Sequence, residues 1–487
     1  MGRPYLCSLI AVACLASALA DCRSQLTTDC GSATGTACVR CARSHQSDLT
    51  RAGCTVKEVG SLCGVSPGPS PPGPVPGRYD LKMVLLNNSD AENGPAVGGR
   101  CLDGSPAGYY YGAPLSTGGD TTKWSIFLKG GGACSTEQAC KARAVMKKGL
   151  GSSTFWTEGE FGGGFTSNDS ASNPDFYDGH RVYVPYCTGD VHSGTRTNAT
   201  AETWGLWFDG HLNFARILDD LKAKRGLSDA RHVLLGGSSA GGFGTFFNAD
   251  YLAAQLPNAA VKAAPQAGWF VPGDPDAVPS SRGAPLNFTA KEVTHSSQLG
   301  SNAGAALWLS YANPPCAEAI GADNCGSVHN MYKYIETPLL VVENQYDTNQ
   351  IFDTVGFCPK PAQYNRNTTL KALADDYIAY YGDLMRKSIA PQIQGHGQTK
   401  AKGKDGLFFP SCLGHGGFPD TKVQSVSDYV DLIGDWFFQR GKYSSHVVID
   451  DCKMTDGLPC NPTCKALSHD ELYQLEKGES ELVTLTQ

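Results

Sequence analysis

His232-Val-Leu-Leu-Gly-Gly-Ser-Ser-Ala-Gly-Gly-Phe243 is the stretch that decides the fold. Its apolar residues Val233–Leu235 predict a short buried strand, and the apolar spacing from Phe243 to Leu256 predicts a helix. Between them, Gly237-Ser-Ser-Ala-Gly241 matches G-x-S-x-G, the strand–turn–helix elbow that exposes a serine hydroxyl at the top of a sheet. The alternative is a glycine-rich loop without function, and the flanking strand and helix favour the elbow. Ser239 is therefore a candidate nucleophile.

Strand-like and helix-like segments alternate through the region around this elbow. Leu212 to Leu221 has helical periodicity and leads into the elbow strand. The apolar or aromatic runs that predict strands are 82–86, the end of 101–110, 124–128, 181–186 and 337–342. This alternation predicts an α/β fold, with a mainly parallel sheet covered by helices on both faces.

A serine hydroxyl needs a base to remove its proton, and the base needs an acid to orient it. In chains with this elbow the acid follows a later strand, and the histidine comes after it. Asp347 stands just past the strand predicted at 337–342. Glu343 and Asp353 compete with it, but Glu343 falls at the strand itself and Asp353 lies further along the chain. Asp347 is the preferred acid.

Four histidines follow Asp347, at positions 396, 415, 446 and 469. His415 lies between glycines, close to Cys412, for which we expect a disulfide. His396 lies in a polar stretch rich in glycine and glutamine. Position alone favours His415 over His396 as the base.

The negative charge that develops on the substrate oxygen needs backbone N–H groups as partners. Ala240 supplies one, because it directly follows the candidate nucleophile. The Gly130-Gly-Gly132 loop follows the strand predicted at 124–128 and is of the kind that supplies the others. Alone, this triplet would predict only a tight turn.

Residues 1–20 have the features of a signal peptide that is removed from the mature protein. Arg3 precedes an apolar run from Leu6 to Leu19, which ends in the small-x-small pattern of Ala18 and Ala20. The run is too short to span a bilayer, and we expect no transmembrane segment. The sequence therefore predicts a protein that is secreted or stays in the endomembrane lumen.

The predicted domain order follows from the cysteines and prolines. Residues 21–63 contain six cysteines in a segment too short to bury a core, which predicts a small disulfide-rich module. Its role, in binding a carbohydrate or a partner or only in folding, is left open. The proline-rich stretch 64–77 predicts an extended linker. The large α/β domain then spans 78–445, and 446–487 is a cysteine-containing C-terminal extension.

Composition limits the partners. The net charge is -7 and the pI is near 5.9, which argues against nucleic acid or an anionic membrane as the main partner. Cys7 and Cys14 lie in the signal peptide, so an odd number of the 19 cysteines remains, and one thiol is free or pairs between chains. We expect a monomer. Five sequons are compatible with a glycosylated surface, at Asn87, Asn168, Asn198, Asn287 and Asn367.

Several motifs occur in order along the large domain: 101–110, 130–134, 186–190, 237–242, 268–270, 346–347 and 411–415. Together they resemble the pectinacetylesterase/Notum family of serine carboxylesterases. The resemblance implies an α/β-hydrolase fold, with Ser239 as nucleophile, Asp347 as acid and His415 as base. The amides that it assigns to the oxyanion hole are those of Gly131, Gly132 and Ala240. We also expect Cys101–Cys187 and Cys134–Cys140 to pair.

The sequence departs from the family pattern at three positions near the site. Lys129 stands where an acidic residue is usual, Ala133 where an aromatic residue precedes the cysteine, and Gln266 where Asp is common. These changes remove no catalytic group, but they affect the walls of the acyl pocket.

The expected reaction is ester hydrolysis through an acyl-enzyme, which needs no metal or organic cofactor. Two substrate classes compete, O-acetyl groups on pectin-like polysaccharide and a fatty acyl group on a secreted signalling protein. The signal peptide, the tethered module and the absence of Trp or Tyr at Gly132 and Ala133 favour the polysaccharide. The remaining alternatives are a binding protein that has lost catalysis and a serine peptidase of the same fold.

Overall fold

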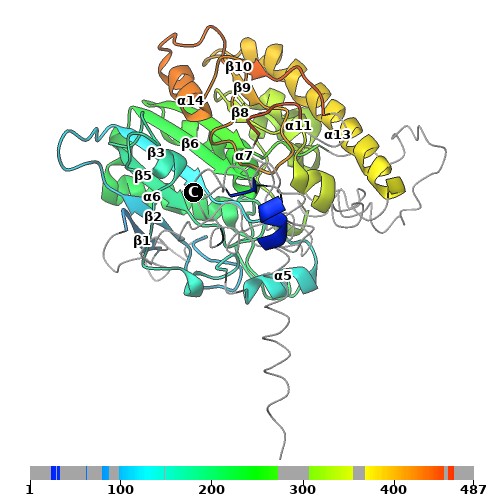
Figure 1. The fold of residues 1–487 in the computed structure, drawn as a ribbon. Coiled ribbons are helices and arrows are strands. Elements are labelled where there is room, and N and C mark those ends of the chain that lie inside the picture. Colours follow the sequence, from blue (N-terminus) through cyan, green and yellow to red (C-terminus); the bar gives the residue numbers. More distant parts are fainter. Residues whose placement is uncertain are drawn as a thin grey trace, which may run out of the picture. The chain divides into compact units, whose positions relative to one another are not determined.

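The computed structural model describes residues 23–28, 30–32, 62, 79–86, 98–146, 148–271, 306–354, 368–454 and 459–464. The chain divides into two compact units, Met1–Arg78 and Tyr79–Gln487. The predicted signal peptide (1–20), the linker (64–77) and most of the module at 21–63 lie outside the described residues. The fold that follows is that of the second unit (Figure 1).

A mixed sheet forms the centre of this unit, with the strand order β10-β9-β8-β7-β6-β3-β5-β2-β1-β4 over the described residues. The strands are β1 Leu81–Leu85, β2 Gly108–Gly112, β3 Lys123–Leu128, β4 Gly159–Glu160, β5 His180–Val184, β6 His232–Ser238, β7 Ala260–Gln266, β8 Leu340–Val342, β9 Gly406–Phe409 and β10 Val447–Ile449. From β10 through β3 to β5 all pairs are parallel, whereas β2, β1 and β4 join as an antiparallel edge. The prediction of a mainly parallel sheet is confirmed.

Helices and short helical turns connect the strands. The α-helices are α5 Glu137–Ala144, α6 Gly210–Arg225, α7 Ala240–Gln255, α10 Pro314–Ile320, α11 Val328–Met331, α13 Thr368–Gln394 and α14 Tyr429–Phe438. The shorter turns are η2 Ser153–Phe155, η3 Gly164–Thr166, η4 Leu227–Asp229, η6 Ala322–Gly326, η7 Tyr332–Tyr334, η8 Asn349–Thr354 and η9 His396–Gln398. Within the described segments, none of the helices is both long and apolar enough to cross a membrane.

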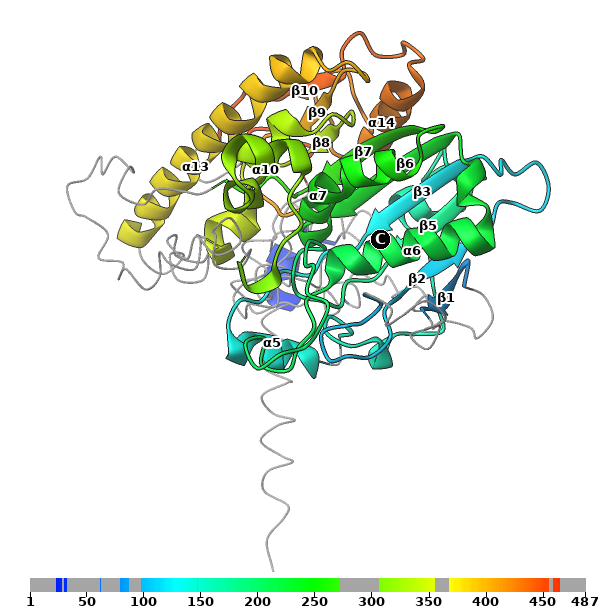
Figure 2. The same ribbon diagram turned by 180° about the vertical axis from the view of Figure 1, so that it is seen from behind.

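The central strands bury both of their faces. On β6, Val233 and Leu235 point to one side and join a core with Phe214 of α6 and Phe246 of α7. Leu234 points the other way and joins a second core that includes the apolar face of α14. Figure 2 shows α6 crossing one face of the sheet, the face opposite to α14. Because side chains alternate along a strand, helices on both faces need strands that are apolar throughout, as predicted.

The sheet extends beyond the boundary that the sequence suggested at 445/446. Val447–Ile449 forms β10 and pairs in parallel with β9, so the segment 446–487 begins inside the sheet. A disulfide between Cys412 and Cys464 joins this segment to the loop after β9. β10 was missed because it has only three residues, between the polar stretches Ser444–His446 and Asp450–Asp451.

The disulfides agree with the pairings expected from sequence. Cys101–Cys187 and Cys134–Cys140 are both present, and Cys412 is bonded as expected. Two further bridges, which the sequence left open, close short loops: Cys316–Cys325 and Cys452–Cys460.

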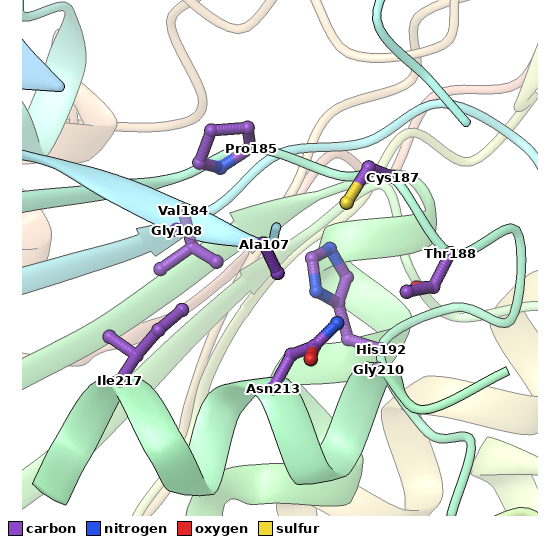
Figure 3. Close-up of a pocket in the computed structure, with 10 residues that line it drawn as sticks. All are labelled: Ala107, Gly108, Val184, Pro185, Cys187, Thr188, His192, Gly210, Asn213 and Ile217. Carbon is purple, nitrogen blue, oxygen red and sulfur yellow. The ribbon is translucent and has the colours of Figure 1, made fainter. Parts of the chain in front are cut away.

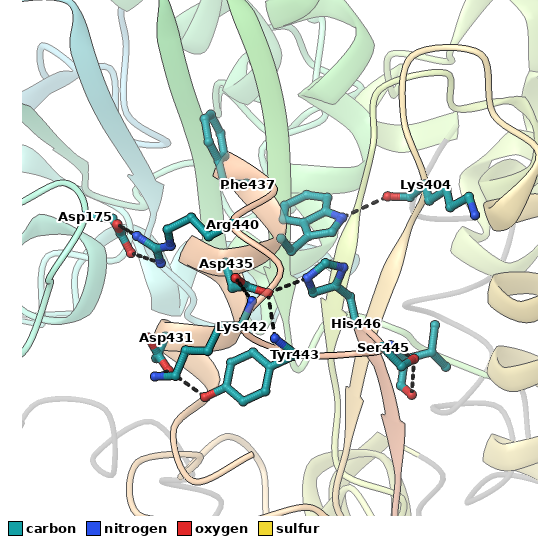
Figure 4. Close-up of polar contacts among 12 residues, drawn as sticks. Asp175, Lys404, Asp431, Asp435, Phe437, Arg440, Lys442, Tyr443, Ser445 and His446 are labelled. Carbon is teal, nitrogen blue, oxygen red and sulfur yellow. Dashed lines mark hydrogen bonds and ion pairs between the residues drawn. The ribbon is translucent and has the colours of Figure 1, made fainter. Parts of the chain in front are cut away.

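A polar cluster fixes the C-terminal end of α14 to the turn that leads into β10 (Figure 4). The buried Asp435 carboxylate accepts hydrogen bonds from the amide of Lys442 at 2.8 Å, the amide of Tyr443 at 3.2 Å and Nε2 of His446 at 2.8 Å. Burial alone would raise the pKa of Asp435, but these hydrogen bonds outweigh it and hold the pKa below its usual range. The ionised form is therefore the one that stabilises this corner.

Asp435→Asn should lower the free energy of unfolding near neutral pH by about 1–3 kcal/mol, because an amide oxygen replaces only part of the acceptor set. A lowered folded pKa gives stability above the pKa of the unfolded chain and loses it as the pH falls through the folded value. The difference between wild type and variant should therefore shrink below about pH 4. Urea unfolding across this pH range measures it. The exposed Asp451→Asn is the control, and a difference independent of pH would contradict the account.

Candidate active site

The predicted site elements follow neighbouring strands of the parallel sheet. The glycine loop 129–134 follows β3, Ser239 follows β6, the acidic loop 343–347 follows β8 and the histidine loop 410–415 follows β9. Carboxyl ends of parallel strands meet at one edge, where loops meet to form sites. The strand order β9-β8-β7-β6-β3 therefore brings elements almost 300 positions apart in the chain to the same edge.

Ser239 occupies a strained turn between β6 and α7. Its backbone has φ 57° and ψ -123°, in a region that side-chain-bearing residues seldom adopt. Its amide donates to the carbonyl of Gln266 at 3.0 Å, and its carbonyl accepts from Phe243 at 2.9 Å. These two bonds attach the Ser239 backbone to β7 on one side and to the start of α7 on the other. The strand–turn–helix geometry is the one that the G-x-S-x-G pattern predicts.

The glycines beside Ser239 are required by close backbone contacts. A Cβ placed on Gly241 would lie 1.9 Å from the Leu128 carbonyl oxygen, and one on Gly237 would lie 2.3 Å from the Gly241 carbonyl oxygen. Real side chains do not approach backbone so closely, so α7 can lie against the end of β3 only with glycine here.

Asp347 and His415 are brought together as the sequence predicts. Nδ1 of His415 lies 2.7 Å from Oδ2 of Asp347, and the other carboxylate oxygen accepts from the amide of Gln350 at 3.0 Å. Asp347 is fully buried, whereas the His415 side chain is 14% exposed. Since an ionised carboxylate can only accept, this bond places a hydrogen on Nδ1 and makes Nε2 the nitrogen able to take up a proton.

The loops that carry Asp347 and His415 are bonded to each other. The side-chain amide of Asn344 donates to the carbonyls of Gly414 and Gly416, both at 2.8 Å. Gly414 in turn donates its own amide to the carbonyl of Tyr346 at 3.1 Å. These bonds hold His415 between two glycines whose carbonyls are both anchored, which fixes the imidazole relative to the carboxylate.

Glu343, the nearer competitor of Asp347, has another set of partners. One carboxyl oxygen accepts from the amide of Trp269 at 2.9 Å and the other from the amide of Asn344 at 3.2 Å. Burial, then the charge of Asp347 and a hydrogen bond with it, raise the pKa of Glu343 well above its usual range. Burial thus favours the protonated form of Glu343, whose carboxyl oxygens support the backbone beside the site. The side chain of Asp353, the other competitor, lies outside the described residues.

The other histidines after Asp347 lie in different surroundings. The His396 ring contacts Tyr332, with 6.1 Å between the ring centroids, and His446 belongs to the Asp435 cluster. His469 lies outside the described residues. Of the described candidates, His415 is the one that contacts Asp347.

The glycine loop lies directly against the serine. A Cβ on Gly130 would come within 2.9 Å of Cβ of Ser239. Gly131 and Gly132 have φ 146° and 63°, both in the range that favours glycine. Ala240 is the first residue of α7, where an amide makes no bond within the helix. Gly130 thus borders the turn that carries Ser239, and the predicted donors Gly131 and Gly132 follow it in the chain.

Sequence reasoning missed two side chains that hold this loop, Arg143 on α5 and His192. Arg143 donates to the carbonyl of Gly131, and Nε2 of His192 lies 2.9 Å from the carbonyl oxygen of Lys129. The predicted Cys134–Cys140 disulfide was the available signal, because it joins the loop to the helix that carries Arg143.

A small pocket lies behind this loop, between the ends of β2 and β5 and helix α6 (Figure 3). Its walls include His192, Cys187 and Asn213, but none of Ser239, Asp347 or His415. The three predicted catalytic residues therefore lie outside this pocket.

The mainly parallel sheet with helices on both faces is the fold of the α/β-hydrolase class. The sequence model described as Pectinacetylesterase matches residues 76–465, and the chain belongs to that family. It is 29% identical over 402 residues to pectin acetylesterase 11 of Arabidopsis thaliana, which covers 78% of this chain and 93% of the relative. It is 27% identical over 412 residues to the palmitoleoyl-protein carboxylesterase notum1a of Danio rerio, which covers 80% of this chain and 73% of the relative.

The human palmitoleoyl-protein carboxylesterase NOTUM is similar to the same extent, with 27% identity over 412 residues, 79% of this chain and 73% of the relative. The names of these relatives are all those of carboxylic ester hydrolases, and this protein is one as well. Identities of 27% and 29% do not separate the two substrate classes.

Glu343→Gln tests the raised pKa of the carboxyl beside Asp347. A group whose folded pKa is raised contributes most below the unfolded pKa, near 4.5, and loses that contribution as the pH rises toward the folded value. Glutamine does not titrate, so the variant should gain stability relative to wild type by up to about 1.4 kcal/mol per pH unit above that point. Urea unfolding from acid to neutral pH measures this gain. The exposed Glu336→Gln should show no such trend, and a flat profile for Glu343→Gln would contradict the assignment.

Proposed function

We propose that this protein is a secreted serine carboxylesterase that removes O-acetyl groups from pectin-like polysaccharide. Ser239 is the nucleophile, His415 the general base and acid, and Asp347 the group that orients His415. The observation that carries the proposal is the 2.7 Å contact of buried Asp347 with His415, at the sheet edge where Ser239 stands in its strained turn.

The proposed reaction has two halves. Nε2 of His415 takes the hydroxyl proton as Oγ of Ser239 attacks the ester carbonyl, and the imidazolium then gives that proton to the departing sugar alkoxide. Water next attacks the acetyl-serine, His415 removes its proton, and acetate leaves as the proton returns to Ser239. The amides of Gly131, Gly132 and Ala240 bind the oxyanion in both halves.

Support for the short acyl group comes from the loop that faces the serine. Gly132 and Ala133 have little or no side chain where a bulky aromatic residue would shape a pocket. A polysaccharide needs an open approach, and small residues at this loop leave room for a sugar ring. Relatives such as pectin acetylesterase 11 of Arabidopsis thaliana are named for removing acetyl groups from pectin, a polysaccharide.

A Notum-like deacylase is the second candidate, and one feature favours it. Aromatic rings lie beside the base, with the Phe270 and His415 centroids 6.4 Å apart and the Phe243 and Phe270 centroids 5.7 Å apart. An apolar wall of this kind suits a longer acyl chain, whose burial contributes about 0.8 kcal/mol per methylene.

Secretion is supported by the signal-peptide pattern at 1–20 and by the disulfides of the large domain, since disulfides persist in oxidising compartments. The cysteine-rich segment at 21–63 and the linker at 64–77 would tether a second module to the esterase. Tethering raises the effective concentration of the enzyme at a polymer surface. A monomer suffices for this arrangement.

Hydrolysis of p-nitrophenyl acetate, octanoate and palmitate by wild type and Ser239→Ala separates the candidates. We expect wild type to have the highest kcat/KM on acetate, and Ser239→Ala to lose about 10³-fold or more. Release of acetate from acetylated pectin then tests the natural substrate class.

A higher kcat/KM of wild type on octanoate or palmitate than on acetate would contradict the acetyl group as substrate and favour a fatty acyl group. Equal activity of wild type and Ser239→Ala would overturn the role of Ser239. Ser238→Ala, one residue away and before the turn, is the matched control and should retain most of the activity.

A further inference from the structure

Arg143 is a buried cation with an unusual set of partners. Its side chain belongs to α5, and the residue is 7% exposed. No carboxylate forms an ion pair with it in the part of the chain that the structure describes. Instead its guanidinium donates to two backbone carbonyls, those of Gly131 and Leu150, the latter at 3.0 Å. It also lies 5.0 Å from the centre of the Tyr186 ring. Burying a guanidinium without an anion is unfavourable, so its position calls for an explanation beyond stability.

The bond to Gly131 determines the direction of a neighbouring amide. The carbonyl of Gly131 and the N–H of Gly132 belong to one planar trans peptide and point in opposite directions. Holding the carbonyl toward Arg143 therefore turns the N–H of Gly132 away from Arg143. Gly132 has φ 63° and no side chain, so the loop by itself does not restrict this orientation.

His192 holds the preceding part of the same loop. Its Nε2 lies 2.9 Å from the carbonyl oxygen of Lys129, and the residue is 3% exposed. Burial lowers the pKa of His192 to about 4, so the ring is neutral at pH 7, and a bond to a carbonyl places its hydrogen on Nε2. Its backbone, with φ 57°, is anchored through its carbonyl to the side chain of Asn248 at 3.0 Å.

Both side chains share one support. The ring of Tyr186 lies under the Arg143 guanidinium and 4.6 Å from the His192 ring, and its hydroxyl accepts from the amide of Val191 at 2.7 Å. Tyr186, just past the end of β5, thus supports both donors, and these hold the carbonyls of Lys129 and Gly131 on either side of Gly130.

We propose that Arg143 and His192 are positioning residues that hold the Gly130–Gly132 loop with the Gly132 N–H directed at the substrate oxyanion. The inference rests on the proposed function. Arg143 has a second effect through its charge, because a carbonyl that accepts from a cation polarises its peptide and strengthens the N–H at the other end. Neither side chain touches the substrate.

The test measures transition-state binding separately from ground-state binding. Arg143→Met should lower kcat for p-nitrophenyl acetate by about 10–100-fold and leave KM within about twofold, because the interaction forms only with the oxyanion. An alkyl boronic acid, which adds to a serine hydroxyl to give a tetrahedral anion, should lose affinity by the same factor as kcat/KM. Thermal melting normalises each value to folded protein.

Arg181→Met is the matched control. Arg181 is a buried arginine at the other end of β5, and its guanidinium pairs with Asp80 at 3.0 Å. Its substitution should lower stability while the folded fraction keeps its kcat and its boronate affinity.

His192→Leu and His192→Gln form a second, independent pair, since glutamine can still donate to the Lys129 carbonyl and leucine cannot. We expect the leucine variant to show the same parallel loss and the glutamine variant to recover most of it. Two results would overturn the positioning roles of Arg143 and His192, provided that the wild type is active. One is a kcat of Arg143→Met or His192→Leu within about twofold of wild type, and the other is a boronate affinity that does not follow kcat/KM. A wild type that neither hydrolyses the ester nor binds boronate would instead overturn the proposed function.

Discussion

The left-handed backbone of Ser239 is the constraint on which the site depends. A non-glycine residue at φ 57° is destabilised by about 1–3 kcal/mol, so the surroundings must impose it. Here β6 ends in the sheet, α7 begins at the next residue, and the amide of Ser239 bonds to Gln266 on the neighbouring strand. The contact of Gly241 with the end of β3 permits the close approach of helix to sheet. The turn is therefore held from both sides and presents the serine at the strand ends.

The parallel sheet then determines which loops can meet this turn. β3 and β7 are the neighbours of β6, and β8 and β9 follow, so the glycine, acidic and histidine loops share its edge. Two buried carboxyls follow β8 with opposite tasks, because Asp347 bonds to an imidazole whereas Glu343 bonds to backbone amides. Burial raises the pKa of Glu343 and also strengthens the interaction of Asp347 with His415. On α5, Arg143 donates to the carbonyl of Gly131 in the glycine loop that follows β3.

The sequence predicted those parts of the structure that depend on local pattern. The strands around 124–128 and 233–235, the helix after Ser239 and the mainly parallel sheet are all present. β7 was missed, although its Gln266 holds the serine amide, because Ala260–Gln266 is rich in alanine and contains a lysine and a proline. Glu343 was seen only as a rival acid, since a raised pKa depends on burial and on its neighbour rather than on sequence. Arg143 gave no signal by itself, because its partners are backbone carbonyls, which every residue has.

Covalent labelling tests the central claim, a serine activated by the His415–Asp347 pair, most directly. A fluorophosphonate reacts with a serine only when a base activates it, and peptide mass mapping identifies the modified residue. The account predicts one adduct, on the peptide that contains Ser239, and a large loss of labelling rate in folded His415→Ala. An adduct on another serine, or undiminished labelling of His415→Ala, would contradict it.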